Sequence, residues 1–197
     1  LTNYNKILIQ RNNLLKQIRF QNNLIDTLEA WDIQLVKYGS EVIKYREKFI
    51  KHLGKVCQKI HNKLTGGKEQ ILLEYDRNVG YDSYLTELKK KRQKDLKYFT
   101  TTVGPHRDDI SFVVNGIDIR KYGSQGQQRT AALSLKLAQI QLMREVMKES
   151  PILLLDDVLS ELDSNRKTYL LESIKDTQTI ITCTGLDEFI SKLLPIQ

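Results

Sequence analysis

Apolar residues recur at helical spacing over the first part of the chain. From Asn12 onward they fall close to a heptad repeat, with Lys, Arg, Asn and Gln between them, at Leu14, Ile18, Ile25, Leu28 and Leu35. This spacing predicts a long amphipathic helix that ends near Gly39. Ser40 is a suitable N-cap for a second amphipathic helix, which Gly66-Gly67 would end. We expect the two helices to form an antiparallel pair.

The pattern changes near residue 100. Before that point, residues 71–75 form a short strand candidate, and a third helix is expected from about Ser83 to Tyr98. A β-branched run over 100–103 then leads into Gly104-Pro105, and proline cannot continue a helix because it lacks the amide hydrogen. We therefore predict a helical arm domain over residues 1–100 and a separate domain over residues 101–197.

Residues 101–197 have the pattern of an α/β domain. Apolar and polar residues alternate on both sides of Asn115-Gly116, which favours a two-residue turn, so a β-hairpin is predicted there. A broad apolar face predicts a buried helix over about 127–149. Two short apolar runs, 152–155 and 179–182, flank a helical segment over about 164–175. That order predicts a βαβ unit whose parallel strands are buried on both faces.

Two carboxylates follow the first of these strands. Asp156 and Asp157 would lie at the carboxyl edge of the predicted sheet, where open α/β folds bind their ligands. Asp156 is the candidate for holding Mg²⁺ through water, because hard cations prefer oxygen ligands. Asp157 is the candidate for orienting or polarising the water that attacks a phosphoryl group. The competing interpretation is that both carboxylates only cap the following loop.

A glycine-containing turn, Tyr122-Gly123-Ser124-Gln125-Gly126-Gln127, precedes the predicted buried helix. Glycine lets the backbone approach closely and the helix start contributes its positive end, so the turn is a candidate phosphate site. A simple helix cap is the competing interpretation. No G-x-x-x-x-G-K-[ST] phosphate loop occurs in the 197 residues. The chain is therefore expected to hold half of a nucleotide site and to be the C-terminal portion of a longer protein.

The net charge of +7 is spread unevenly. Residues 1–100 carry 20 Lys and Arg against 11 Asp and Glu, whereas residues 101–197 carry 11 against 13. The densest basic patch comprises Lys89, Lys90, Lys91, Arg92 and Lys94. Such an excess suits a polyanion partner such as nucleic acid, although a solvated helix face has the same composition.

The two cysteines, Cys57 and Cys183, lie in segments of different type, which argues against a disulfide framework and favours a reducing cytoplasm. Cys57 and His61 are one helical turn apart, but two further ligands are not evident nearby. No zinc site is predicted, and the pair is interpreted as a half-buried thiol and a solvated histidine. No apolar run approaches the roughly 20 residues that span a bilayer, so no membrane partner is expected.

These motifs resemble those of the ABC-type ATPase heads. The turn around Ser124 is similar to the signature motif of that family, the strand ending in Asp156-Asp157 to its Walker B strand, and Ser160-Glu161-Leu162-Asp163 to its D-loop. Two further features resemble the RecF type of head: Gly104-Pro105-His106-Arg107-Asp108-Asp109, and Ser-Gln-Gly-Gln in place of Ser-Gly-Gly-Gln. The resemblance is rich in motifs over 100–197. Over 1–100 it rests on length and helical character.

The resemblance implies an ATP- and Mg²⁺-dependent DNA-binding protein of recombinational repair and replication-fork maintenance. ATP would join two subunits into a homodimer, and the signature residues of one subunit would reach the γ-phosphate held by the other: Ser124, Gln125, Gly126 and Gln127. The implied partners are single- and double-stranded DNA, near junctions of the two, and RecR- and RecO-like mediators of recombinase loading.

Two departures from the wider family pattern bear on catalysis. Asp157 stands where most ABC heads have glutamate, so the carboxylate is one methylene shorter and slow hydrolysis is expected. The switch histidine is absent, and Thr182 or Thr184 occupies that region. A hydroxyl can donate a hydrogen bond to phosphate but carries no positive charge. His106 and Arg107 suit either a DNA contact or a loop that ties the arm to the head.

Three other functions are compatible with parts of this sequence. A nucleotide-independent protein-interaction scaffold would use the helical arm and leave the carboxylates without a role. A Rad50-like or chromosome-maintenance head would carry an arm hundreds of residues long, so an arm of residues 1–100 argues against it. A transporter ATPase subunit would co-fractionate with membranes.

Overall fold

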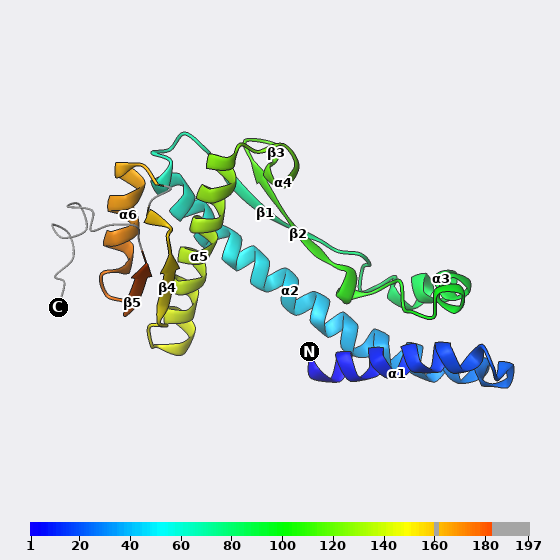
Figure 1. Ribbon diagram of the computed structural model, residues 1–197. Coiled ribbons are helices and arrows are strands. Elements are labelled where there is room, and N and C mark those ends of the chain that lie inside the picture. The colour runs from blue at the N-terminus through cyan, green and yellow to red at the C-terminus, as the bar shows by residue number, and fades with distance from the viewer. Residues whose placement is uncertain (160–161, 183–197) are drawn as a thin grey trace. The chain divides into compact units, whose positions relative to one another are not determined.

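The computed structural model describes residues 1–159 and 162–182. Its helices and strands are labelled in Figure 1. The chain forms two compact units: the first comprises Leu1–Lys51 and Glu74–Ser111, and the second comprises His52–Leu73 and the described residues from Phe112 onward. The division at residue 100, into an arm and a head lobe, has different bounds and stays a prediction.

Helices make up most of the first unit. They are α1 (Thr2–Ile18), η1 (Asn22–Thr27), the first part of α2 (Leu28–Leu64), α3 (Tyr84–Tyr98) and η2 (Pro105–Arg107). Each long helix buries one face because its apolar residues recur every three or four positions. The apolar core between the helices consists of Tyr4, Ile7, Leu35, Ile43, Val79, Tyr84, Leu88 and Val103.

The predicted bounds of the first helix are wrong at both ends. α1 begins at Thr2 rather than near Asn12, and it ends at Ile18. The chain then turns through η1 before α2 starts. Tyr4 and Ile7 are buried at helical spacing with Leu14, so the apolar stripe had an earlier start than the heptad count suggested.

The predicted break at Gly39 is also wrong, because α2 passes through Gly39 and Ser40 without interruption. Close packing explains why the residue at position 39 is glycine. A Cβ added there would lie 2.5 Å from Cε1 of Tyr84 and 3.1 Å from Cε2 of Tyr4. The missing side chain therefore lets two buried aromatic rings approach the helix backbone.

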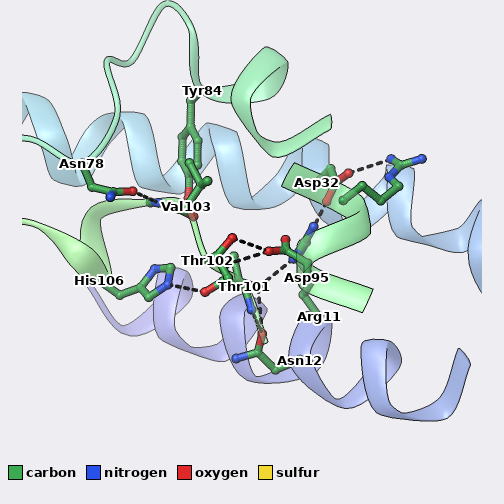
Figure 2. A network of polar contacts seen from close by, with 12 residues as sticks. Arg11, Asn12, Asp32, Asn78, Tyr84, Asp95, Thr101, Thr102, Val103 and His106 are labelled. Atoms are coloured by element: carbon green, nitrogen blue, oxygen red, sulfur yellow. Dashed lines mark hydrogen bonds and ion pairs between the residues drawn. The ribbon is translucent and has the colours of Figure 1, made fainter. Parts of the chain in front are cut away.

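Charged and polar side chains form a network inside the first unit (Figure 2). Arg11 donates hydrogen bonds to Asp32 at 2.7 Å, to Asp95 at 2.8 Å and to the Thr101 hydroxyl at 2.8 Å. Arg92 donates to the second oxygen of Asp32 at 2.9 Å. Two guanidinium groups thus oppose two carboxylates, and Arg11 and both aspartates are fully buried. The network ties α1, α2 and α3 to the loop around Thr101.

The second unit contains the later elements of the chain. They are the end of α2, α5 (Gln125–Met147), α6 (Ser164–Ile174) and the strands β3 (Ile117–Asp118), β4 (Leu153–Asp156) and β5 (Thr179–Thr182), with the single-turn α4 (Ile119–Tyr122). β1 (Ile71–Asp76), β2 (Asp109–Val114) and β3 form one three-stranded sheet in that order.

The predicted hairpin is confirmed. β2 pairs antiparallel with β3, with Val113 opposite Asp118 and Val114 opposite Ile117. Asn115 and Gly116 have φ values of 49° and 83°, which is the left-handed backbone that a two-residue hairpin turn requires. The Asn115 side chain also accepts a hydrogen bond from the Gln70 amide at 2.9 Å, which fixes the turn against the segment before β1.

The predicted βαβ unit is confirmed as well. β4 and β5 are parallel neighbours (Figure 1), with Leu154 opposite Ile180 and Asp156 opposite Thr182, and α6 connects them. The expectation that both faces of the strands are buried is wrong for the described residues. Leu155 is 7% exposed, but Leu154 on the other face is 70% exposed. Leu154 and Ile180 therefore present an uncovered apolar face.

Candidate nucleotide-binding site

The parallel pairing brings the first carboxylate of the predicted site to a threonine. Asp156 is the last residue of β4 and Thr182 the last of β5, and they are opposite in the register. The Thr182 hydroxyl donates a hydrogen bond to Oδ1 of Asp156. Both residues are exposed at the carboxyl edge of the two strands. The threonine that was predicted for the switch region thus lies beside the predicted Mg²⁺ ligand.

Asp157 lies at the same edge. Its amide donates to the Thr182 carbonyl oxygen at 3.1 Å and lies 3.2 Å from the Thr182 hydroxyl oxygen. Its φ of 49° places it in the left-handed region, which aspartate tolerates better than bulky residues. The chain therefore turns sharply after β4 and exposes the second carboxylate.

The residue types at this edge fit a magnesium ion. Asp156 supplies an exposed carboxylate and Thr182 a hydroxyl oxygen, and hard cations prefer such oxygen ligands, often with several waters retained. Within residues 1–159 and 162–182, three or more His, Cys, Asp or Glu side chains nowhere gather as a metal site would require. That Asp156 holds the ion through water stays a prediction.

The glycine-containing turn forms the start of α5. Ser124 is the N-cap: its hydroxyl oxygen accepts from the Gln127 amide at 3.2 Å, and the Gln127 side chain accepts from the Ser124 amide at 3.1 Å. This reciprocal capping box is the helix-cap interpretation of the sequence. It leaves the hydroxyl hydrogen of Ser124 and the first amides of the helix, those of Gln125 and Gly126, for a ligand.

The side chains under this turn lead to the segment after α2. Nε2 of Gln127 donates to Oε1 of Glu69 at 3.1 Å. The Thr130 hydroxyl donates to the Gly126 carbonyl oxygen at 2.7 Å, and Thr130 is fully buried. Sequence patterns did not reveal Glu69, because it follows a helix terminator and belongs to no motif.

The predicted D-loop is described only in part. Asp163 is the N-cap of α6, where its side chain accepts from the Arg166 amide at 3.0 Å and pairs with the Arg166 guanidinium at 3.3 Å. Ser160 of the D-loop and Thr184 of the switch region lie outside the described residues. Their assigned roles stay predictions.

Three of the five residues in the predicted basic patch on α3 form ion pairs. Lys89 pairs with Glu29 at 3.0 Å, Lys90 with Glu87 at 2.7 Å, and Arg92 with the buried Asp32 at 2.9 Å. The other two members of the patch are exposed, and neither has an ion-pair partner in the described part of the chain: Lys91 and Lys94. Those two are the better candidates for contact with a polyanion.

His106, which follows Gly104-Pro105, is held by hydrogen bonds within the first unit. His106 lies with Nδ1 2.7 Å from the Tyr4 hydroxyl and Nε2 2.9 Å from the Thr101 carbonyl oxygen. A carbonyl can only accept, so Nε2 carries the hydrogen and Nδ1 accepts from Tyr4. Burial lowers the pKa of His106, which favours this neutral form. Arg107, by contrast, is exposed.

The interpretation of Cys57 and His61 needs correction, because neither side chain is exposed at all. Burial raises the pKa of the Cys57 thiol to about 12, so it stays protonated. His61 lies 3.3 Å from Glu69 and 2.9 Å from Ser134. It is an interior polar residue of the second unit rather than a solvated one.

No family model matches the chain. It is 57% identical over 190 residues to the DNA replication and repair protein RecF of Agathobacter rectalis, covering 96% of this chain and 52% of that protein. It is 56% identical over 198 residues to the protein of the same name from Lachnospira eligens, covering 100% of this chain and 54% of that protein. The chain belongs to the RecF family.

Solved structures of RecF proteins have a similar fold. A structure described as the recombination mediator protein RecF-ATP in the RecFOR pathway matches with a TM-score of 0.85 and 39% identity, over 95% of this chain and 52% of that one. The fold is therefore the α/β fold of a RecF head of the ABC ATPase type. The chain spans about half the length of the curated RecF relatives it matches. Within the described residues, no helix is both long and apolar enough to cross a membrane.

Proposed function

We propose that this chain is part of an ATP-dependent DNA-binding protein of recombinational repair and replication-fork maintenance. The observation that carries the proposal is the sheet edge where Asp156, Asp157 and Thr182 meet, in a chain similar to a RecF-ATP structure. Because the chain spans about half the length of its relatives, the activity belongs to the complete protein.

Two groups of residues would act on nucleotides of different subunits. At the sheet edge, Asp156 would hold Mg²⁺ through water and Asp157 would orient the attacking water. At the start of α5, the Ser124 hydroxyl hydrogen and the free amides of the first turn would contact the γ-phosphate bound by the other subunit. The capping box supports this role because it uses a lone pair of Ser124 and not its hydrogen.

ATP would therefore join two subunits into a clamp on DNA. The exposed Lys91 and Lys94 on α3 supply positive charge for the DNA backbone. Junctions of double- and single-stranded DNA, and RecR- and RecO-like mediators that help load recombinase, complete the proposed setting. The solved relative named for the RecFOR pathway supports this assignment.

Light scattering of the complete protein on duplex DNA tests the proposal. We expect the protein mass to double when Mg·ATP is added. Ser124→Arg should abolish the doubling and spare ATP binding, because it fills the turn that faces the other subunit's nucleotide. A mass indifferent to ATP would favour the nucleotide-independent scaffold instead.

Hydrolysis is expected to be slow, since the Asp157 carboxylate is a methylene shorter than glutamate. Asp157→Asn should then trap the ATP-bound dimer, because the amide cannot polarise water. Turnover that is unchanged in this variant would argue against the assigned role of Asp157 and leave the dimer proposal standing.

A further inference from the structure

The second unit holds a buried histidine with an unusual set of neighbours. His61 is fully buried, near the end of α2. Its Nδ1 lies 2.9 Å from the Ser134 hydroxyl, and its Nε2 lies 3.3 Å from Oε2 of Glu69. Among the described residues neither Nε2 nor Oε2 has another partner. The two atoms therefore satisfy each other or stay unpaired in the interior, which is costly.

The positions of the hydrogens follow from this geometry. Nε2 and Oε2 of Glu69 lie 3.3 Å apart but outside hydrogen-bond geometry, and because a carboxylate can only accept, the contact is favourable only when Nε2 carries the hydrogen. Burial lowers the pKa of His61, so the neutral ring with this single hydrogen is favoured, and Nδ1 then accepts from Ser134. The Ser134 hydroxyl can also donate to the Thr130 carbonyl oxygen, 2.7 Å away, when Nδ1 is protonated.

Glu69 connects this histidine to the start of α5. Its other oxygen, Oε1, accepts from Nε2 of Gln127 at 3.1 Å. That contact fixes the orientation of the Gln127 amide, because only the nitrogen end can face a carboxylate. The oxygen end is then directed at the Ser124 amide, 3.1 Å away. A rotated Gln127 would present a donor to a donor and open the capping box.

A second set of contacts runs from the same histidine to the same turn. The Thr130 carbonyl oxygen lies 2.7 Å from the Ser134 hydroxyl, one helical turn away, and the Thr130 hydroxyl donates to the Gly126 carbonyl oxygen at 2.7 Å. Ser134 and Thr130 are both fully buried. The Ser134 hydroxyl has one hydrogen, so it donates to Thr130 only when it does not donate to Nδ1 of His61. In the favoured tautomer, the link from His61 to the Ser124–Gln127 turn therefore runs through Glu69.

We propose that His61 is a positioning residue for the Ser124–Gln127 turn, acting through Glu69 and the Gln127 amide to hold the turn ready for a nucleotide phosphate. This inference rests on the proposed function of that turn. His61 itself touches no nucleotide. It keeps the Glu69 carboxylate oriented, and Glu69 keeps the capping box closed.

The charged groups around His61 come from two further elements. Glu69 approaches from the segment before β1, and Arg166 acts from α6, where it pairs with Asp163. Cys57 lies one turn earlier on α2, and its thiol is neutral. Of the two charged groups that act on His61, Glu69 is the negative one, so loss of its charge or of its His61 partner should disturb the turn.

The test compares two amide replacements in the complete protein. His61→Gln places a donor near the former Nε2 and can still reach Glu69. His61→Asn keeps only the Nδ1 side and leaves Glu69 without its partner. The readout is the Mg·ATP concentration that gives half-maximal dimerisation on duplex DNA, with ATP binding and thermal unfolding measured in parallel.

We expect His61→Asn to raise this concentration about fivefold to tenfold, the effect of one or two lost hydrogen bonds, and His61→Gln to stay within about twofold of wild type. Affinity for ATP itself should not change. Glu69→Ala should match His61→Asn, and the double variant should be no worse than either, because both act through one path. His52→Asn, an exposed histidine of the same helix, is the matched control and should have no effect.

Distinct outcomes separate this inference from the function on which it rests. If the wild-type protein ignores ATP, the proposed function fails and the inference fails with it. A second outcome is that ATP dimerises the wild type but not Ser124→Arg, which supports the proposed function. If His61→Asn and Glu69→Ala then dimerise at the same Mg·ATP concentration as the wild type, only the inference is overturned. Equal losses in His61→Gln and His61→Asn that follow their unfolding temperatures would make His61 a packing residue. Should His61→Asn fail to fold, the part-exposed Glu69→Ala decides alone.

Discussion

The first unit holds a network of buried charges, whereas the second exposes two carboxylates at the edge of a sheet. Arg11, Asp32 and Asp95 have no exposed side-chain surface. Asp156 and Asp157 are exposed at the edge of β4. A buried ion network is costly to desolvate and is tolerated only when every charge is matched, so it fixes geometry. Exposed carboxylates are available to a ligand.

The comparison separates residues whose charges stabilise the fold from residues whose charges are available to a ligand. In the first unit, two cations and two carboxylates compensate each other. Thr101 accepts from Arg11 and Thr102 donates to Asp95, whereas Nη2 of Arg11 and Nε of Arg92 have no hydrogen-bond partner in the described part of the chain. In the second unit, the Asp156 carboxylate accepts a hydrogen bond from the Thr182 hydroxyl, and both Asp156 and Asp157 are exposed. Substitution should therefore damage stability in the first unit and nucleotide chemistry in the second.

The largest effect is expected from Arg11→Met. The change leaves Asp32 and Asp95 buried with reduced compensation, so the free energy of unfolding should fall by about 3–5 kcal/mol. Urea unfolding of the complete protein measures it. Lys16→Met, an exposed change on the same helix, is the control and should stay within about 0.5 kcal/mol. An Arg11 variant as stable as this control would refute the network's role.

Two glycines of α2 give a matched pair, one in each unit. Gly39→Ala should destabilise by about 1–3 kcal/mol, because the new Cβ would lie 2.5 Å from the buried ring of Tyr84. Gly54→Ala should stabilise by about 0.5–1 kcal/mol, since its Cβ would lie 3.6 Å from the nearest atom, in Leu73, and alanine favours the helix. Thermal unfolding of both variants provides the test. The same sign for both would contradict the packing explanation of Gly39.

Local sequence rules predicted the parts of the fold that depend on neighbouring residues. The hairpin at Asn115-Gly116 followed from turn chemistry, and the parallel pair β4 and β5 from two apolar runs around a helix. The break at Gly39 failed because glycine also serves close packing between helices distant in sequence. A local pattern contains no information on the Tyr84 ring 45 positions later.

The candidate site was predictable to a similar extent. Asp156 and Asp157 follow an apolar strand, and Ser124 precedes a helix, so their types and positions were visible. His61 and Glu69 were not, since their relation to Gln127 exists only after the segments fold together. Arg11 had a signal that the heptad count overlooked: it lies on the stripe of Ile7 and Leu14, where a charge needs a buried partner.

The basic patch on α3 allows lysines with an ion-pair partner to be compared with lysines that have none among the described residues. Lys91→Ala with Lys94→Ala should weaken duplex binding by the complete protein and reduce the salt dependence of log K by about two, if each contacts one phosphate. Lys89→Ala with Lys90→Ala should have the smaller effect, because these lysines already pair with Glu29 and Glu87. Binding isotherms at several salt concentrations measure both. Equal slopes for the two double variants would remove α3 from the proposed DNA surface.

The smallest effect is expected from pH, through His106 in the first unit. Burial lowers its pKa in the folded protein below the ordinary value of 6.5. Between the two pKa values the unfolded chain binds more protons, so the contribution to stability is complete above about pH 6.5 and is lost as the pH falls through the lowered pKa. The unfolding temperature of the wild type should therefore drop more between pH 7.5 and 5.5 than that of His106→Gln, which cannot titrate. Parallel pH profiles would mean that the hydrogen bonds to Tyr4 and Thr101 hold the ring whether or not it is charged. The contrast between buried and exposed ionisable groups would then depend on the Arg11 network alone.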